Sequence, residues 1–141
     1  MNYPLLDTTD PTTCISGKMG RISRITSSIF RKHIKPYGLS TSQMSLLFLL
    51  SKRDNLNQKE ICDILYMEKS TLNRNLRRLF EKSYATKVDF PEINITNEGK
   101  ALLERAIPSW NEAMKEIRSL LNEDGEEAVS SILTKLKNTT L

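Results

Sequence analysis

Two short amphipathic helical patterns in close succession, between Asn57 and Tyr84, constrain the fold of this chain more than any other part of its sequence. The stretch reads NQKEICDILYMEKSTLNRNLRRLFEKSY. Asn57 and Glu60 have the spacing of a capping box, in which each side chain pairs with a backbone N–H at the start of a helix. Because the connection through Tyr66 and Met67 is tight, the stretch predicts a helix-turn-helix.

The second of these helices has two chemically distinct faces. At about 100° per residue, the apolar face is formed by Leu72, Leu76, Leu79 and Phe80. The opposite face carries Ser70, Arg74, Arg77 and Glu81, with Thr71, Asn73 and Arg78 beside it. Such a helix can rest on a core and place hydroxyl, amide and guanidinium groups in a DNA major groove. A solvated surface helix is the simpler explanation for arginines alone, but the preceding helix, the tight turn and the Ser-Thr pair favour DNA binding.

Neighbouring segments supply a support for this motif. Ser40 and Gln43 repeat the capping-box spacing, and the run MSLLFLL that follows is apolar on almost every side. That pattern predicts a buried central helix. After the second motif helix, residues 83–88 and 92–96 favour β-strands of about four residues each, which predicts a hairpin that depends on packing against the helices. A hairpin in this place is the wing of a winged helix.

The N-terminal part predicts an arm followed by a long helix. Residues 1–13 read as an extended arm that ends in a cap at Thr12 or Thr13, and the apolar spacing over residues 15–35 predicts an amphipathic helix. His33, near the end of that helix, is interpreted as a surface residue with no carboxylate beside it.

The C-terminal part predicts a second helical region, capped by Thr96 or Asn97. Pro108 is expected to kink this helix because it lacks an N–H, and Asp124 with Glu127 predicts the cap of a separate last helix. The apolar stripes at the two ends of the chain indicate a helical interface between two subunits. Folding of these helices onto each other in a monomer is the alternative.

Charge is distributed unevenly along the chain. Residues 15–36 contain six basic and no acidic residues, whereas residues 98–127 contain eight acidic and four basic ones. One end of the molecule is therefore suited to face a polyanion. The two cysteines have no metal-binding or disulfide spacing. Cys62 is interpreted as a small buried residue, whereas Cys14, at the start of a basic helix, is a candidate redox thiol.

Composition and motifs argue against several classes of protein. No apolar run approaches the roughly 20 residues of a membrane span, and no basic region followed by an apolar stretch marks a secretory signal, so we expect a cytoplasmic protein. A single histidine, the lack of a glycine-rich phosphate loop and the lack of a metal-ligand cluster argue against an enzyme, and no cofactor is expected. We expect one domain over residues 1–141, with the winged helix-turn-helix at 39–96 and dimerisation helices at 1–36 and 97–141.

The order of these elements resembles the MarR family of transcriptional regulators. The similarity lies in GLSTSQMSLLFLL (38–50), LNQKEICDILYMEKSTLNRNLRRLFEKSY (56–84) and ITNEGKALLERAIPSWNEAMKEI (95–117). It implies a mainly α-helical homodimer with a small β-wing, which binds a pseudo-palindromic site in double-stranded DNA. The base-reading positions of the family fall on Ser70, Thr71, Asn73, Arg74 and Arg77, and Lys69, Arg78 and Lys87 complete the candidate DNA-binding residues.

The wing departs from the family pattern. Family wings are longer and carry an arginine that enters the minor groove, whereas the turn here reads DFPE over residues 89–92 and Lys87 is its only base. Two acids would repel phosphates, so we expect the wing to contribute little to DNA affinity. The alternatives are a dimeric interaction module with weakened DNA binding and a redox-sensing regulator that acts through Cys14.

The resemblance also implies a small effector, commonly aromatic or anionic, between the dimerisation helices and the winged domain. The candidate residues around such a molecule are Arg21, Arg24, Phe30, Arg31, Tyr37 and Trp110. The alternative is that these residues only pack and solvate the dimer.

Overall fold

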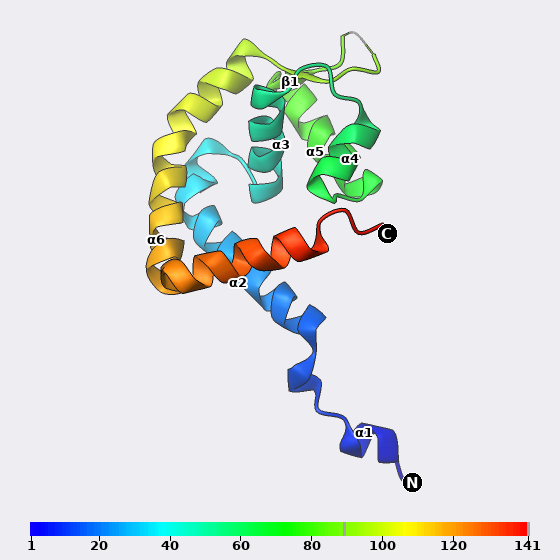
Figure 1. The fold of residues 1–141 in the computed structure, drawn as a ribbon. Helices are drawn as coiled ribbons and strands as arrows, with labels where there is room; N and C mark the ends of the chain where they lie inside the picture. Colours follow the sequence, from blue (N-terminus) through cyan, green and yellow to red (C-terminus); the bar gives the residue numbers. More distant parts are fainter. Residues whose placement is uncertain (89, 141) are drawn as a thin grey trace.

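The computed structural model describes residues 1–88 and 90–140 of the chain (Figure 1). In chain order, the elements are α1 (Pro4–Thr8), the 3-10 helix η1 (Pro11–Thr13), α2 (Ile15–Ile34), the 3-10 helix η2 (Lys35–Tyr37), α3 (Thr41–Lys52), α4 (Gln58–Leu65), α5 (Lys69–Glu81), β1 (Ala85–Thr86), β2 (Asn94–Ile95) and α6 (Asn97–Leu136). The predicted class, mainly α-helical with a small two-stranded wing, is confirmed. Asp89 of the predicted wing turn lies outside the described residues. Over the described ranges, no helix has the length and apolar character that crossing a bilayer requires.

The core lies where α3, α5 and the start of α6 meet. Its centre consists of leucines that are at most 1% exposed: Leu46, Leu47, Leu50, Leu72, Leu76 and Leu79. Burying one such side chain contributes about 1.5–3 kcal/mol, so the apolar face of α5 is held firmly to α3. The prediction that residues 44–50 form a buried central helix is therefore confirmed.

The wing is shorter than predicted. β1 and β2 pair antiparallel over two residues each, with Ala85 opposite Ile95 and Thr86 opposite Asn94. Beyond them, the Ile93 N–H donates to the Leu56 carbonyl at 2.7 Å, so the loop before α4 takes the place of a longer first strand. The expected four-residue strands were wrong because Ile93 pairs with this distant loop rather than with its hairpin neighbour.

The N-terminal segment is not an extended arm, as the sequence suggested. Pro4 opens the short helix α1, since its ring already holds the backbone angle of a first helical residue. Thr12 and Thr13 do not cap α2, because Asp10 binds both: its carboxylate accepts from the Thr12 hydroxyl at 2.6 Å, and its carbonyl accepts from the Thr13 hydroxyl at 2.8 Å. The cap is Cys14 instead.

Helix α6 follows a bent path around the molecule (Figure 1). Thr96 is its cap, and its hydroxyl accepts from the Gly99 N–H at 3.0 Å. The break in helical geometry lies at Asn122, with φ +60° and ψ −177°, and not at Pro108. These angles lie outside the left-handed helical region, in a region where residues other than glycine are rarely found, so the two helical segments meet at an abrupt bend. Asp124 is no cap, because it lies inside the helical stretch that follows Asn122.

A charged cluster joins α2 to α6, which pack against each other. The Lys32 ammonium donates to Glu116 Oε1 at 2.6 Å, and His33 Nε2 lies 3.2 Å from Glu116 Oε2. The hydrogen bond from Lys32, and then that from His33, lowers the pKa of the Glu116 carboxyl. The interpretation of His33 as a residue without a carboxylate was wrong, since the partner comes from a helix distant in sequence.

Candidate nucleic-acid interface

Hydrogen bonds between residues that are close together in the sequence define the start of α4 and the turn that follows it. At the start of α4, Asn57 Oδ1 accepts from the Glu60 N–H at 2.8 Å, and Glu60 Oε1 accepts from the Asn57 N–H at 3.2 Å. At its end, Tyr66 adopts the left-handed conformation with φ +51°, and the Cys62 carbonyl accepts from the N–H groups of both Tyr66 and Met67. This left-handed residue ends the helix, so the predicted tight turn is confirmed. Helix α5 then begins after two further residues.

Helix α5 presents its predicted polar face to solvent. Its exposed polar and charged residues include Lys69, Ser70, Asn73, Arg74, Arg77 and Arg78, whereas Thr71 is half-buried. In the described part of the chain, none of the three arginines forms an ion pair. Arg74 Nη2 lies 3.5 Å from Thr71 Oγ1, which is at the long limit of a hydrogen bond. The guanidinium groups are thus available to an external acceptor.

A further basic position lies where the wing meets α5. Lys87 is exposed, and its Nζ lies 5.4 Å from the centre of the Phe80 ring, within cation–π range. Beside it, a groove of about 350 Å³ separates the wing from the start of α4, lined by Asn57, Gln58, Lys59, Lys87, Phe90, Pro91 and Ile93. Glu92, one of the two acids expected to repel phosphate, is half-buried and does not line this groove. The weak contribution of the wing stays a prediction.

Lys59 is a candidate residue that the sequence reasoning missed. It lies in the first turn of α4, on the opposite side of the groove from Lys87, and its Nζ is 3.2 Å from Asp63 Oδ2. Helix N-termini attract phosphate, so the position of this lysine, two residues after the Asn57 cap, could have identified it in the sequence as a candidate DNA-binding residue. Because the pair with Asp63 is exposed, it holds the lysine only weakly.

The predicted effector residues are only partly brought together. Phe30 and Trp110 border a cavity of about 80 Å³, which Ile34, Thr41, Met44, Ser45 and Phe48 also line. The Phe48 and Trp110 rings meet edge to face, with centres 5.4 Å apart. Tyr37 does not border this cavity but shares a 2.9 Å hydrogen bond with Ser109. Of the three predicted arginines, Arg21, Arg24 and Arg31, none lines it.

Cys14 serves as the N-cap of α2. Its Sγ accepts from the Gly17 N–H at 3.3 Å, and the residue is exposed. Cys62 packs against the core but is only half-buried, so the sequence interpretation as a small buried residue overstated its burial. The redox role of Cys14 stays a hypothesis.

Comparison with known proteins agrees with this arrangement. Residues 37–92 match the model of the MarR family. An HTH-type transcriptional regulator of Bacillus cereus, described as uncharacterized, is 25% identical over 120 residues, which cover 82% of each chain. A regulator of Bacillus thuringiensis subsp. konkukian matches to the same extent.

Solved structures share the fold. The transcriptional repressor CouR bound to p-coumaroyl-CoA superposes with a TM-score of 0.80 at 22% identity, over 92% of this chain and 95% of that one. CouR bound to a 23-mer DNA duplex gives a TM-score of 0.77 at 22% identity, over 89% and 93% of the two chains. The M. tuberculosis regulator MosR in complex with DNA gives 0.76 at 21% identity, over 89% and 99%. The helix-turn-helix and the first strand of its wing thus lie within a segment, residues 37–92, that matches the MarR family, and the chain as a whole is similar to HTH-type transcriptional regulators and shares the fold of the solved repressors.

Proposed function

We propose that the chain acts as a homodimer that binds a pseudo-palindromic DNA site, with one copy of α5 in each of two successive major grooves. In a two-fold dimer the two helices would lie about 34–36 Å apart, one turn of the double helix. The observation that carries this proposal is the solvent-facing side of α5, where Arg74 and Arg77 have no ion-pair partner among the described residues.

Each class of side chain on α5 has a distinct role in this proposal. Arg74 or Arg77 reads guanine, because the guanidinium fork matches O6 and N7 and gives about 1–3 kcal/mol of discrimination. Ser70 and Thr71, at the start of the helix, anchor phosphates. The residues Lys69, Asn73, Arg78 and Lys87 flank these positions and contact the DNA backbone or neighbouring base edges.

The dimer is proposed from apolar side chains that a single copy leaves in water. On α2 and α6 these exposed residues are Ile15, Ile22, Ile25, Leu120, Val129, Ile132, Leu133 and Leu136. Many large apolar side chains left in water on two helices that pack together are typical of an interface, and we assign a second copy as the occupant because both helices come from the ends of one chain. Sedimentation equilibrium tests this: Ile132→Glu with Leu136→Glu should shift the chain toward the monomer, and an unchanged mass would refute the assignment.

Selection of bound duplexes from a random DNA pool tests the central proposal, because it reports binding, symmetry and spacing together. Arg74→Ala should relax the preference at one base pair in each half-site. Arg105→Ala is the matched control, since Arg105 is an exposed arginine of α6 whose guanidinium donates to the Ala101 carbonyl at 3.4 Å, away from α5. An Arg74→Ala protein with the wild-type sequence preference would remove Arg74 from the reading role.

A salt titration separates this function from that of a dimeric interaction module. Binding to DNA should weaken linearly on a log–log plot against salt concentration, with a slope of about −0.9 for each phosphate neutralised. A protein that uses the same scaffold only for protein contacts would give no measurable duplex binding at low salt.

For the effector, we propose that an aromatic group enters beside Trp110. The present cavity of about 80 Å³ is smaller than the roughly 300–1,000 Å³ of ordinary ligand pockets, so the site must open further on binding. The likeness to a repressor solved with p-coumaroyl-CoA supports an aromatic ligand. Trp110 is the single tryptophan, so its fluorescence reports directly on this site. Titration with p-coumaroyl-CoA should alter that fluorescence, and Phe30→Ala should weaken the response.

A further inference from the structure

Helix α6 contacts the chain on both sides of the recognition helix α5. At the start of α6, the Thr96 N–H donates to the Tyr84 carbonyl at 3.1 Å, and Gly99 packs directly against the same carbonyl. Tyr84 lies just after α5. The first turn of α6 therefore holds the segment that follows the recognition helix.

The other end of α6 returns to the segment that precedes α5. The non-helical angles of Asn122 turn the helix sharply, and its last part then runs back across α2 toward the helix-turn-helix (Figure 1). The described chain thus passes from the wing, around the molecule, to the turn between α4 and α5.

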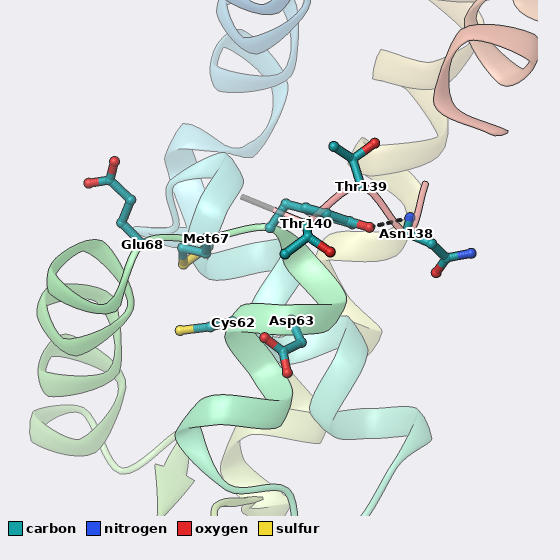
Figure 2. Close-up of a pocket in the computed structure, with 8 residues that line it drawn as sticks. Cys62, Asp63, Met67, Glu68, Asn138, Thr139 and Thr140 are labelled. Carbon is teal, nitrogen blue, oxygen red and sulfur yellow. Dashed lines mark hydrogen bonds between the residues drawn. The ribbon is translucent and has the colours of Figure 1, made fainter. Parts of the chain in front are cut away.

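The residues after α6 form an ordered turn at this point. Asn138 adopts a left-handed conformation with φ +70°, and the Leu136 carbonyl accepts from the N–H of Thr139 at 3.2 Å and from its hydroxyl at 2.6 Å. This turn directs the Asn138 N–H to the hydroxyl of Tyr66, which accepts it at 2.6 Å (Figure 2). Tyr66 is the left-handed residue that ends α4.

Figure 2 shows the tail lying over the end of α4. Residues 138–140 line one side of an open cavity of about 500 Å³, and residues 62, 63 and 66–68 line the rest. The tail therefore spans the turn without filling the space beneath it. Among the described residues, the hydrogen bond to Tyr66 is the polar contact that joins the tail to the helix-turn-helix.

We propose that residues 138–140 are an intramolecular strap that fixes the orientation of the recognition helix relative to α6. Tyr66 lies three residues before the first residue of α5, so a restraint on Tyr66 is a restraint on the end of the helix that leads into the groove. In a dimer built on α2 and α6, this restraint sets the distance between the two recognition helices. The consequence for DNA rests on the proposed function, whereas the strap itself does not.

The strap is tested first in the full-length protein without DNA. Tyr66→Phe removes only the hydroxyl, and a chain that ends at Lys137 removes the whole strap. A neutral hydrogen bond changes an equilibrium by roughly twofold to tenfold, so amide hydrogen exchange over residues 62–70 should accelerate by about that factor in both variants. Tyr84→Phe is the matched control, because no hydrogen bond to its hydroxyl occurs among the described residues, and it should exchange at the wild-type rate. Wild-type exchange in both strap variants would overturn the proposal.

The second test measures tolerance to half-site spacing. Duplexes that carry the selected half-sites with one base pair added or removed should bind the wild-type protein several-fold more weakly than the selected spacing. Loss of the strap should reduce this ratio in both variants and leave the preferred bases unchanged. Faster exchange with an unchanged spacing ratio would show that the contact is structural only and would refute the orienting role. If the wild-type protein binds no duplex, the proposed function fails, while the exchange experiment still decides the strap.

Discussion

Replacement of Gly99 by alanine should destabilise the protein, although alanine is the better helix former. Gly99 is the third residue of α6, and a Cβ there would overlap the Tyr84 carbonyl oxygen and lie 2.8 Å from Ile95 Cγ1. The propensity gain is at most about 1 kcal/mol. Against it, overpacking costs about 1–3 kcal/mol. Displacing the Tyr84 carbonyl also weakens its bond to the Thr96 N–H, worth about 0.5–1.5 kcal/mol. We therefore expect a net loss of about 0.5–3.5 kcal/mol.

Gly17→Ala is the matched control, because Gly17 is also the third residue of a helix whose cap side chain accepts from the glycine N–H. The atoms nearest to a Cβ at Gly17 lie 3.6 Å away, at ordinary contact distance. This variant should be neutral or more stable by up to about 1 kcal/mol. Urea unfolding followed by circular dichroism, at one fixed protein concentration, measures both changes. A Gly99→Ala protein as stable as the wild type would refute the claim that the wing backbone closes this site.

Three further changes have expected outcomes that urea unfolding also measures. Leu76→Ala should cost about 2–5 kcal/mol, because the side chain is 1% exposed at the centre of the core. Asn57→Ala removes the cap of α4 and should cost about 0.5–2 kcal/mol; an unchanged midpoint would contradict the capping role. Glu116→Gln should lower stability most above pH 4.5, the ordinary pKa of a glutamate, because Lys32 and His33 lower the pKa of Glu116 in the folded state. The difference from wild type should shrink as the pH falls through that lowered value, and a difference that grows toward acid pH would contradict it.

The helix-turn-helix could be predicted because its determinants are local. The box of Asn57 with Glu60 and the apolar spacing of α5 act within one or two turns of helix, and both appear in the structure as predicted. The solvent-facing side of α5 follows from the same periodicity, since burial of Leu72, Leu76 and Leu79 leaves the arginines outside.

The errors arose where a distant or competing partner decides the outcome. The sequence predicted Thr12 or Thr13 as a helix cap, but the hydroxyls of both threonines donate hydrogen bonds to Asp10 instead. The carboxylate beside His33 comes from a residue 83 positions away, which periodicity cannot reveal. The sequence predicted a kink at Pro108, yet the backbone angles remain helical there and the helical geometry is interrupted at Asn122. A proline removes one hydrogen bond, whereas the extended ψ and positive φ of Asn122 redirect the backbone itself.

The path of α6 gives the two ends of the recognition helix different kinds of support. At the Tyr84 end, backbone packs on backbone, and only a residue without a side chain fits at Gly99. At the Tyr66 end, one hydrogen bond and a partly hollow contact join the tail to the turn. The α6 residues that we expect a second copy to cover, from Leu120 to Leu136, lie on the part of this helix between these two contacts. We therefore expect a change at that surface to disturb the weaker Tyr66 contact before the Tyr84 contact, so that the end of α5 near Tyr66 moves more than the end near Tyr84.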